Sequence, residues 1–147
     1  MEITQQIEWD MGHRITNHRS KCHNLHGHRY KLEICLQGEL ISETRASDEG
    51  MVMDFGDVKK IAMKYVHDQF DHGFMIWEKD LILFNFFKQN FHLKHVIVPF
   101  IPTAENISHH IFNVLDKHYI HKYKTNLQLS YVRLWETPNS TAICSRK

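Results

Sequence analysis

The N-terminal third of the chain alternates between apolar and polar side chains, which is the pattern of strands that bury one face. In residues 2–13 one parity is apolar and ends in a histidine: Ile3, Ile7, Trp9, Met11 and His13. The segment 28–39 repeats the pattern with Tyr30, Leu32, Ile34 and Leu36, and His26 and His28 share this parity. We therefore expect two strands that each carry histidine on the buried side.

Two later segments have apolar positions at helical spacing. Asp54 is suited to the N-cap of a first helix that ends near Phe70, because short polar side chains satisfy the free backbone donors of a first turn. Thr103 is suited in the same way to begin a second helix with an apolar stripe. Between them, residues 79–91 indicate a shorter helix and residues 96–100 a brief extended piece.

The chain closes with another pair of extended segments. Residues 127–136 and 141–145 flank a Thr-Pro-Asn turn and predict a β-hairpin. Apolar side chains on both parities of 127–136 are typical of a strand buried on both faces. With 40–50 as a loop, the order is β-β-α-(α)-α-β-β, and we expect one antiparallel α+β domain spanning 1–147.

Length and composition narrow the function classes. A chain of 147 residues can bury an ordinary core, and 18 Lys and Arg against 17 Asp and Glu leave a net charge of +1. That balance gives no reason to expect nucleic acid or a membrane as a partner. The most apolar stretch, Leu81 to Phe91, is interrupted before membrane-spanning length. A start without a signal-peptide pattern and three cysteines that cannot all pair favour a soluble, cytoplasmic protein.

Histidine is unusually frequent, with 13 among 147 residues. His26 and His28 lie two positions apart on a predicted strand, so both imidazoles project to one face and can reach a single metal ion. His13, at the end of the neighbouring predicted strand and on its apolar side, is the natural third ligand. Three neutral nitrogen ligands suit Zn²⁺ best, although iron, nickel or copper would also bind. The alternative is a set of ordinary core or surface histidines without metal.

Three further residues have chemistry suited to proton transfer. Cys22 lies four residues before His26 and close to the expected metal, where a thiolate could accept a proton; a buried, inert cysteine is the alternative. Asp71 and His72 follow the first predicted helix. They could form a base and its orienting partner, or equally a capping feature on the surface.

Two acidic residues could bind a ligand with paired N–H donors, such as a guanidine or an aminopyrimidinone edge. Glu105 lies in the first turn of the second predicted helix, where a favourable interaction with the helix dipole is the alternative explanation. Glu136 ends a predicted strand at a turn, where ordinary solvent exposure is the alternative. The residues by themselves do not decide between these explanations.

Six motifs together resemble the 6-pyruvoyltetrahydropterin and 6-carboxytetrahydropterin synthase family over nearly the whole chain. In order, they are His13, Cys22-x-x-x-His26-Gly-His28-x-Tyr30, Gly50-Met-Val-Met-Asp54-Phe55, Asp71-His72, Pro102-Thr-Ala-Glu105-Asn106 and Trp135-Glu136-Thr137. Each is weak alone, and their combination in the family's order is specific. The chain departs from the family after His72, where Gly73-Phe-Met-Ile stands in place of the usual Leu-Asn.

The resemblance implies a role for each candidate residue. The implied roles are Zn²⁺ binding for His13, His26 and His28, proton abstraction for Cys22, a second acid/base pair for Asp71 and His72, and pterin binding for Glu136 with Glu105 beside it. It implies no particular triphosphate-binding residue. Nearby candidates, each also consistent with an ordinary solvated surface, are Arg14, Arg19, Lys21 and Arg29.

The resemblance also implies the tunnelling fold. In this fold a four-stranded antiparallel sheet carries two main helices on one face, in the order β-β-α-α-β-β. Three subunits close their sheets into a barrel, and two such trimers stack into a homohexamer. Closure removes the free sheet edges and places the active sites between subunits.

The reaction implied by the resemblance is that of a zinc-dependent lyase acting on 7,8-dihydroneopterin triphosphate. Because the chain is expected in the cytoplasm, we favour the branch that forms 6-carboxy-5,6,7,8-tetrahydropterin, releases acetaldehyde and triphosphate, and serves 7-deazaguanine and queuosine synthesis. The alternatives are 6-pyruvoyltetrahydropterin synthase activity by triphosphate elimination, a non-catalytic pterin-binding protein on the same fold, and an assembly domain whose histidines store metal.

Overall fold

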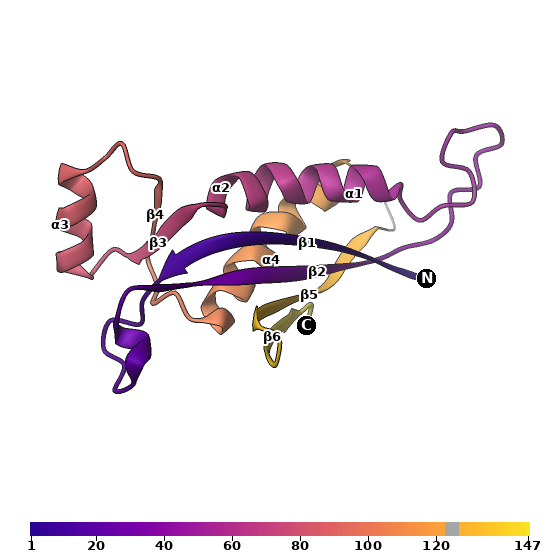
Figure 1. Ribbon diagram of the computed structural model, residues 1–147. Helices are drawn as coiled ribbons and strands as arrows, with labels where there is room; N and C mark the ends of the chain where they lie inside the picture. The colour runs from indigo at the N-terminus through magenta and orange to yellow at the C-terminus, as the bar shows by residue number, and fades with distance from the viewer. Residues whose placement is uncertain (123–126) are drawn as a thin grey trace.

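The centre of the protein is an antiparallel hairpin of two long strands, as the alternation predicts. β1, Glu2–His13, pairs with β2, His26–Gln37, along its whole length and brings His13 opposite His26. Their apolar side chains share one face, and helices cover that face (Figure 1). The structure is a computed structural model that describes residues 1–122 and 127–147.

Six strands form one sheet, in the spatial order β4-β3-β1-β2-β5-β6. The other strands are β3, Gly73–Trp77; β4, His95–Val98; β5, Gln128–Thr137; and β6, Ser140–Ser145. β5 and β6 form the predicted closing hairpin and extend the antiparallel part of the sheet beside β2. β3 and β4 run parallel to β1 and to each other. The expectation of four antiparallel strands is therefore wrong, because two parallel strands are added beside β1.

The added strands carry no strong sequence signal because they are short and their pairing is non-local. β3 pairs with β1 only at Met11 and Gly12. A Cβ at Gly12 would lie 2.4 Å from Cδ2 of Phe74, so glycine permits the close approach of β3. The crossover that parallel neighbours need is supplied by α3, Leu81–Gln89, which confirms the short helix expected in 79–91.

A helical rod and one long helix pack on the covered face of the sheet. The rod consists of α1, Phe55–Ala62, a π-helical turn, Met63–His67, and α2, Asp68–Phe70, and it ends at Phe70 as predicted. The carboxylate of Asp54 accepts the N–H of Gly56 at 2.7 Å, which confirms the expected cap. α4, Ala104–Lys122, follows Thr103, whose Oγ1 accepts the N–H of Asn106 at 3.3 Å. None of the helices described is long and apolar enough to span a membrane.

The mixed apolar pattern of β5 has a local cause. Cys35 of β2 pairs with Tyr131, whereas the next residue, Leu36, pairs with Leu129, so one residue of β5 bulges out of the ladder. The bulge changes which parity faces the helices, and Leu129 and Val132 are both fully buried. The residues on the other parity, Tyr131 and Trp135, are only half-buried in the single chain. The single chain buries one face of β5, and burial of the other face in a closed barrel stays a prediction. The bulge accounts for the buried residues of both parities, Leu129 and Val132.

A buried carboxylate ties the β3–α3 extension to the end of β1. Asp80 is 2% exposed and accepts hydrogen bonds from Arg14 Nε at 2.5 Å, Arg14 Nη2 at 2.7 Å and Thr16 Oγ1 at 2.9 Å. It also caps α3 through the N–H of Leu83. Burial alone would raise the pKa of Asp80, but these donors outweigh burial and hold it below its ordinary value. The contact anchors both the extension and the loop that follows His13.

We expect the change Asp80→Asn to lower the free energy of unfolding by about 2 to 4 kcal/mol, because it removes the buried carboxylate that pairs with the half-buried Arg14. Urea denaturation at a fixed protein concentration measures the change. The matched control is Glu78→Gln, which removes the same charge from an exposed side chain two residues away. Equal stability of the two variants would contradict an anchoring role for Asp80.

Candidate metal centre

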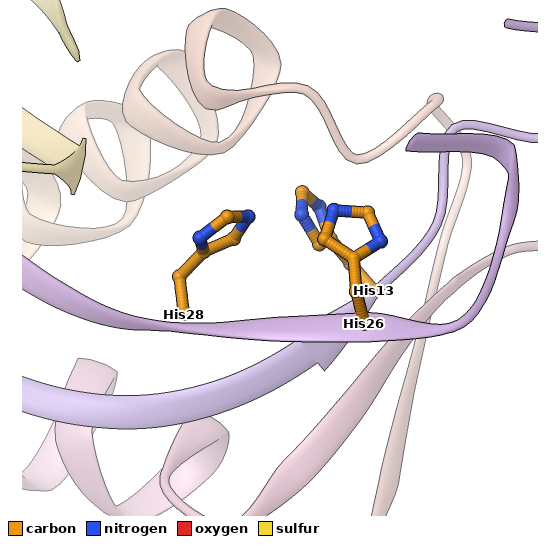
Figure 2. Close-up of side chains that lie close together, drawn as sticks. All are labelled: His13, His26 and His28. Atoms are coloured by element: carbon orange, nitrogen blue, oxygen red, sulfur yellow. The ribbon is translucent and has the colours of Figure 1, made fainter. Parts of the chain in front are cut away.

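Three imidazoles meet where β1 ends and β2 begins. His13 and His26 are cross-strand partners, and His28 lies two residues further along β2 on the same face. Each residue offers a ligand atom, and these atoms all lie within 4.8 Å of one another. The ring centroids are 4.6 Å apart for His13 and His26, and 5.1 Å apart for His26 and His28. Figure 2 shows the three rings on one side of the β2 ribbon. The predicted grouping of the three histidines is confirmed.

Backbone carbonyls orient two of the three rings. His13 Nδ1 lies 2.7 Å from the carbonyl oxygen of Pro102, and His26 Nδ1 lies 2.8 Å from that of Asn24. A carbonyl oxygen can only accept a hydrogen bond, so the proton of each ring is on Nδ1 and the lone pair is on Nε2. This is the usual outer arrangement of metal-binding histidines, in which the non-ligating nitrogen donates to a fixed acceptor.

Burial favours the neutral form of His13 and His28. The pKa of His13 is lowered to about 4, chiefly by burial, with the Pro102 carbonyl acting in the opposite direction and the neighbouring His26 and His28 adding to the lowering. Burial also lowers the pKa of His28, against the opposing charge of Glu136. Neutral imidazole is the form that binds a metal ion. The donor set therefore fits a divalent ion of the nitrogen-preferring class, to which zinc belongs.

Two aromatic side chains support the triad: Tyr30 packs against its rings, and Trp9 packs on Tyr30. The ring of Tyr30 meets those of His13 and His28 edge-on, at centroid distances of 5.9 and 5.7 Å, and Trp9 stacks on Tyr30 at 5.7 Å. Burial raises the pKa of Tyr30, so its hydroxyl keeps its proton 3.3 Å from the ring nitrogens of His13. Sequence reasoning missed this support, although Tyr30 continues the parity of the two β2 histidines and could have been found by that signal.

A hollow of about 300 Å³ adjoins the triad and collects most of the predicted residues. Its lining includes His13, His26, Cys22, Glu105 and Glu136. Cys22 is half-buried in a short 3-10 turn, Lys21–His23, and its carbonyl accepts the N–H of Ile15 at 2.8 Å. Glu136 Oε1 lies 3.5 Å from His13 Nε2, and the side chain of Glu136 is 26% exposed. One chain thus brings a thiol and two carboxylates to the metal-binding group.

Asp71 and His72 form a pair elsewhere in the chain. Asp71 Oδ2 lies 2.7 Å from His72 Nδ1, and Asp71 Oδ1 accepts the backbone N–H of Asp10 at 3.1 Å. The His72 side chain is 77% exposed, and its backbone is left-handed with φ of 56°. The hydrogen bond from His72 lowers the pKa of Asp71, and the N–H of Asp10 adds to this effect. Asp71 is therefore a carboxylate at neutral pH.

This pair does not reach Cys22 within one chain. His72 lines another hollow, of about 380 Å³, together with Asp10, Arg29 and His28 of the triad, and Cys22 is not part of its lining. Among the described residues, no hydrogen bond or ion pair links Asp71 or His72 to Cys22 or to a histidine of the triad.

Comparison with other sequences gives consistent matches. A sequence model of the 6-pyruvoyl tetrahydropterin synthase family matches residues 2–147. The 6-carboxy-5,6,7,8-tetrahydropterin synthase of Haemophilus influenzae is 37% identical over 142 residues, which are 95% of this chain and 94% of that protein. The protein of the same name from Rickettsia felis is 36% identical over 140 residues, which are 95% of this chain and 96% of that protein.

Solved structures share the fold. An uncharacterised protein from Wolinella succinogenes superposes with a TM-score of 0.82 at 22% identity, covering 100% of this chain and 98% of that one. The 6-pyruvoyl tetrahydropterin synthase of Caenorhabditis elegans superposes with a TM-score of 0.70 at 24% identity, covering 100% of this chain and 96% of that one. At such identities these two likenesses establish the fold alone.

The geometry predicts that His26→Ala and His28→Ala will each reduce the bound divalent metal from about one ion per chain to less than roughly a tenth, because two imidazoles hold an ion poorly. Elemental analysis after loading with zinc and removal of excess measures the content. The control is His23→Ala, which changes an exposed histidine of the segment between β1 and β2 and should retain the metal. A normal metal content in both ligand variants would rule out the triad as a metal site.

Proposed function

Because the chain belongs to the 6-pyruvoyl tetrahydropterin synthase family, we propose that it is a 6-carboxy-5,6,7,8-tetrahydropterin synthase that uses zinc. Its substrate is 7,8-dihydroneopterin triphosphate, and with water the products are 6-carboxy-5,6,7,8-tetrahydropterin, acetaldehyde and triphosphate. Relatives with this name are 37% and 36% identical over 95% of the chain. The observation that carries the proposal is the hollow that places Cys22 and two carboxylates beside the three histidines. The proposal places the reaction in the cytoplasm, in 7-deazaguanine and queuosine synthesis.

His13, His26 and His28 would hold the zinc ion. Three neutral nitrogen donors leave a fourth position for substrate or water, as in catalytic zinc sites. When bound, zinc supplies Lewis-acid polarisation of the oxygen atoms of the substrate side chain, which acidifies the adjacent C–H group. The carbonyls of Pro102 and Asn24 keep two of the rings in the tautomer that this binding requires.

Cys22 is the residue we assign to removal of that proton. Its side chain lines the hollow beside the triad, and the hydrogen bond from Ile15 to its carbonyl fixes the turn that carries it. Glu136 and Glu105 are assigned to the pterin ring, because a carboxylate matches the paired N–H donors of an aminopyrimidinone edge. Glu136 comes from β5 and Glu105 from α4, so the two carboxylates can bind the pterin ring from different elements.

The second acid/base pair is assigned to Asp71 and His72 of a neighbouring subunit. In one chain His72 lines a different hollow from Cys22, and no described hydrogen bond or ion pair joins Asp71 or His72 to Cys22, which favours supply of the pair by a second copy. The sheet supports such assembly, since the edge of β1 that faces away from β2 has no partner strand along residues 2–9, and the outer edge of β6 is also free among the described strands. Pairing these edges between copies would close a barrel of three subunits, and we propose a homohexamer of two such trimers.

The direct test is incubation of the zinc-loaded protein with 7,8-dihydroneopterin triphosphate, followed by mass analysis of the pterin and of trapped aldehyde. We expect 6-carboxy-5,6,7,8-tetrahydropterin and one equivalent of acetaldehyde. A 6-pyruvoyl product without aldehyde would assign the alternative branch. Unchanged substrate with tight pterin binding would favour a non-catalytic binding protein.

Replacement of Cys22 by Ala should lower kcat by at least about a hundredfold, because the variant lacks the proton acceptor. Its zinc content and oligomeric size should match those of the wild type. The control is Cys144→Ala, which alters a half-buried cysteine of β6 and should retain activity. Full activity of the Cys22 variant would remove this thiol from the mechanism.

Mixed oligomers can show whether the site is shared. Cys22→Ala and His72→Ala chains should each be inactive alone, whereas co-expressed chains should recover about a quarter of the sites if subunits mix at random. Recovery occurs because some sites pair an intact Cys22 from one chain with an intact His72 from another. Activity per site after co-purification with two different tags measures it. Absence of any recovery in verified mixed oligomers would contradict a shared site.

A further inference from the structure

The segment around the metal centre is strongly basic. Between Asp10 and Glu33 the sequence has no carboxylate, but it has five cationic side chains, at Arg14, Arg19, Lys21, Arg29 and Lys31. This segment includes Cys22 and the three histidines of the triad. The net charge of the chain is only +1, so the positive charge is concentrated here rather than spread over the molecule.

Three of the five cations already have partners within the chain. Arg14 is held by Asp80, and Arg29 lies 2.8 Å from Asp10 and 3.7 Å from Glu8. Lys31 lies over the ring of Trp135, 4.7 Å from its centroid. The hollow that Arg29 and Lys31 line, of about 550 Å³, also contains Glu8, so it is poorly suited to a polyanion.

Arg19 and Lys21 differ from the other three. Both are exposed, and within residues 1–122 and 127–147 neither side chain has a hydrogen-bond or ion-pair partner. An ordinary surface cation is common, but two such cations within the three residues that precede Cys22 are a more specific arrangement. They remain available for an external anion.

The loop that carries these two cations is held at its base and projects from the end of the sheet (Figure 1). Arg14 and Thr16 are fixed by Asp80, and the N–H of Ile15 donates to the carbonyl of Cys22. His18 and Cys22 both line the hollow beside the triad. Arg19 follows one residue of the lining and Lys21 precedes the other, so both cations belong to the short segment that forms part of the wall of the hollow.

We propose that Arg19 and Lys21 bind the triphosphate group of the substrate, an inference that rests on the proposed function. Phosphate oxygens accept charge-assisted hydrogen bonds from guanidinium and ammonium groups. The carboxylates of the hollow come from α4 and β5, whereas the cations come from the loop between β1 and β2. Acidic and basic ends of this kind orient a substrate that has N–H donors at one end and phosphates at the other.

The first test is the double variant Arg19→Gln with Lys21→Gln. We expect KM for 7,8-dihydroneopterin triphosphate to rise about tenfold or more, with kcat changed by less than about twofold, because the contacts lie away from the reacting carbon. The inhibition constant of 7,8-dihydroneopterin, which lacks the phosphates, should stay unchanged. Salt should weaken substrate binding less in the variant than in the wild type.

The control is Lys60→Gln with Lys88→Gln, which removes the same charge from exposed side chains of α1 and α3 and should leave KM unchanged. An unchanged KM in the Arg19 and Lys21 variant would overturn the proposal. An equal rise in KM and in the inhibition constant of 7,8-dihydroneopterin would also overturn it, since that result means damage to the pterin pocket.

The second test is independent of turnover. Calorimetry with inorganic triphosphate and the metal-free protein avoids chelation of zinc by the ligand. The wild type and the Lys60 and Lys88 control should bind it equally, and the Arg19 and Lys21 variant about tenfold more weakly. Equal binding by all three proteins would overturn the subsite. If the wild type binds triphosphate through these residues but does not convert the substrate, the proposed function fails and the anion site stands.

Discussion

The antiparallel register of β1 and β2 is the constraint on which the candidate site depends. It places His13 opposite His26, and the two-residue period of β2 then brings His28 to the same face. A slip of one residue in β1 would turn His13 to the other face of the sheet and expose Trp9 to water. Burial of that apolar face therefore holds the metal ligands in place, and the same interaction that stabilises the fold specifies the chemistry.

The parts predicted from the sequence are those with a local pattern. The alternation of β1 and β2 is enough to group three histidines, and short polar caps mark the starts of two helices. β3 could not be predicted in this way, because it pairs with β1 only at Met11 and Gly12. The carbonyl of Pro102 that holds His13 is 89 residues away in the chain, so its role depends on tertiary structure. The bulge in β5 has the same origin, since pairing with β2 decides which residue is left out.

The candidate site residues fall into two groups within one chain. Cys22 lines the hollow beside the triad, whereas His72 lines another hollow together with Arg29 and His28. No sequence pattern reports this division, because it depends on which face of the sheet each loop joins. Under the proposed assignment of Asp71 and His72 to a neighbouring subunit, catalysis would be coupled to assembly, and an isolated subunit would retain the three histidines but lack part of the acid/base chemistry.

The π-helical turn Met63–His67 has a consequence for the position of Asp71. Such a turn holds one residue more than an α-helical turn, so the part of the rod beyond it is rotated by about 100° relative to an uninterrupted α-helix. The direction in which the chain leaves Phe70, and hence the approach of Asp71 to the edge of β1, depends on that additional residue. Insertion or deletion of a residue within the rod would therefore displace Asp71 and His72, the pair to which we assign proton transfer, even though the rod itself packs in the hydrophobic core.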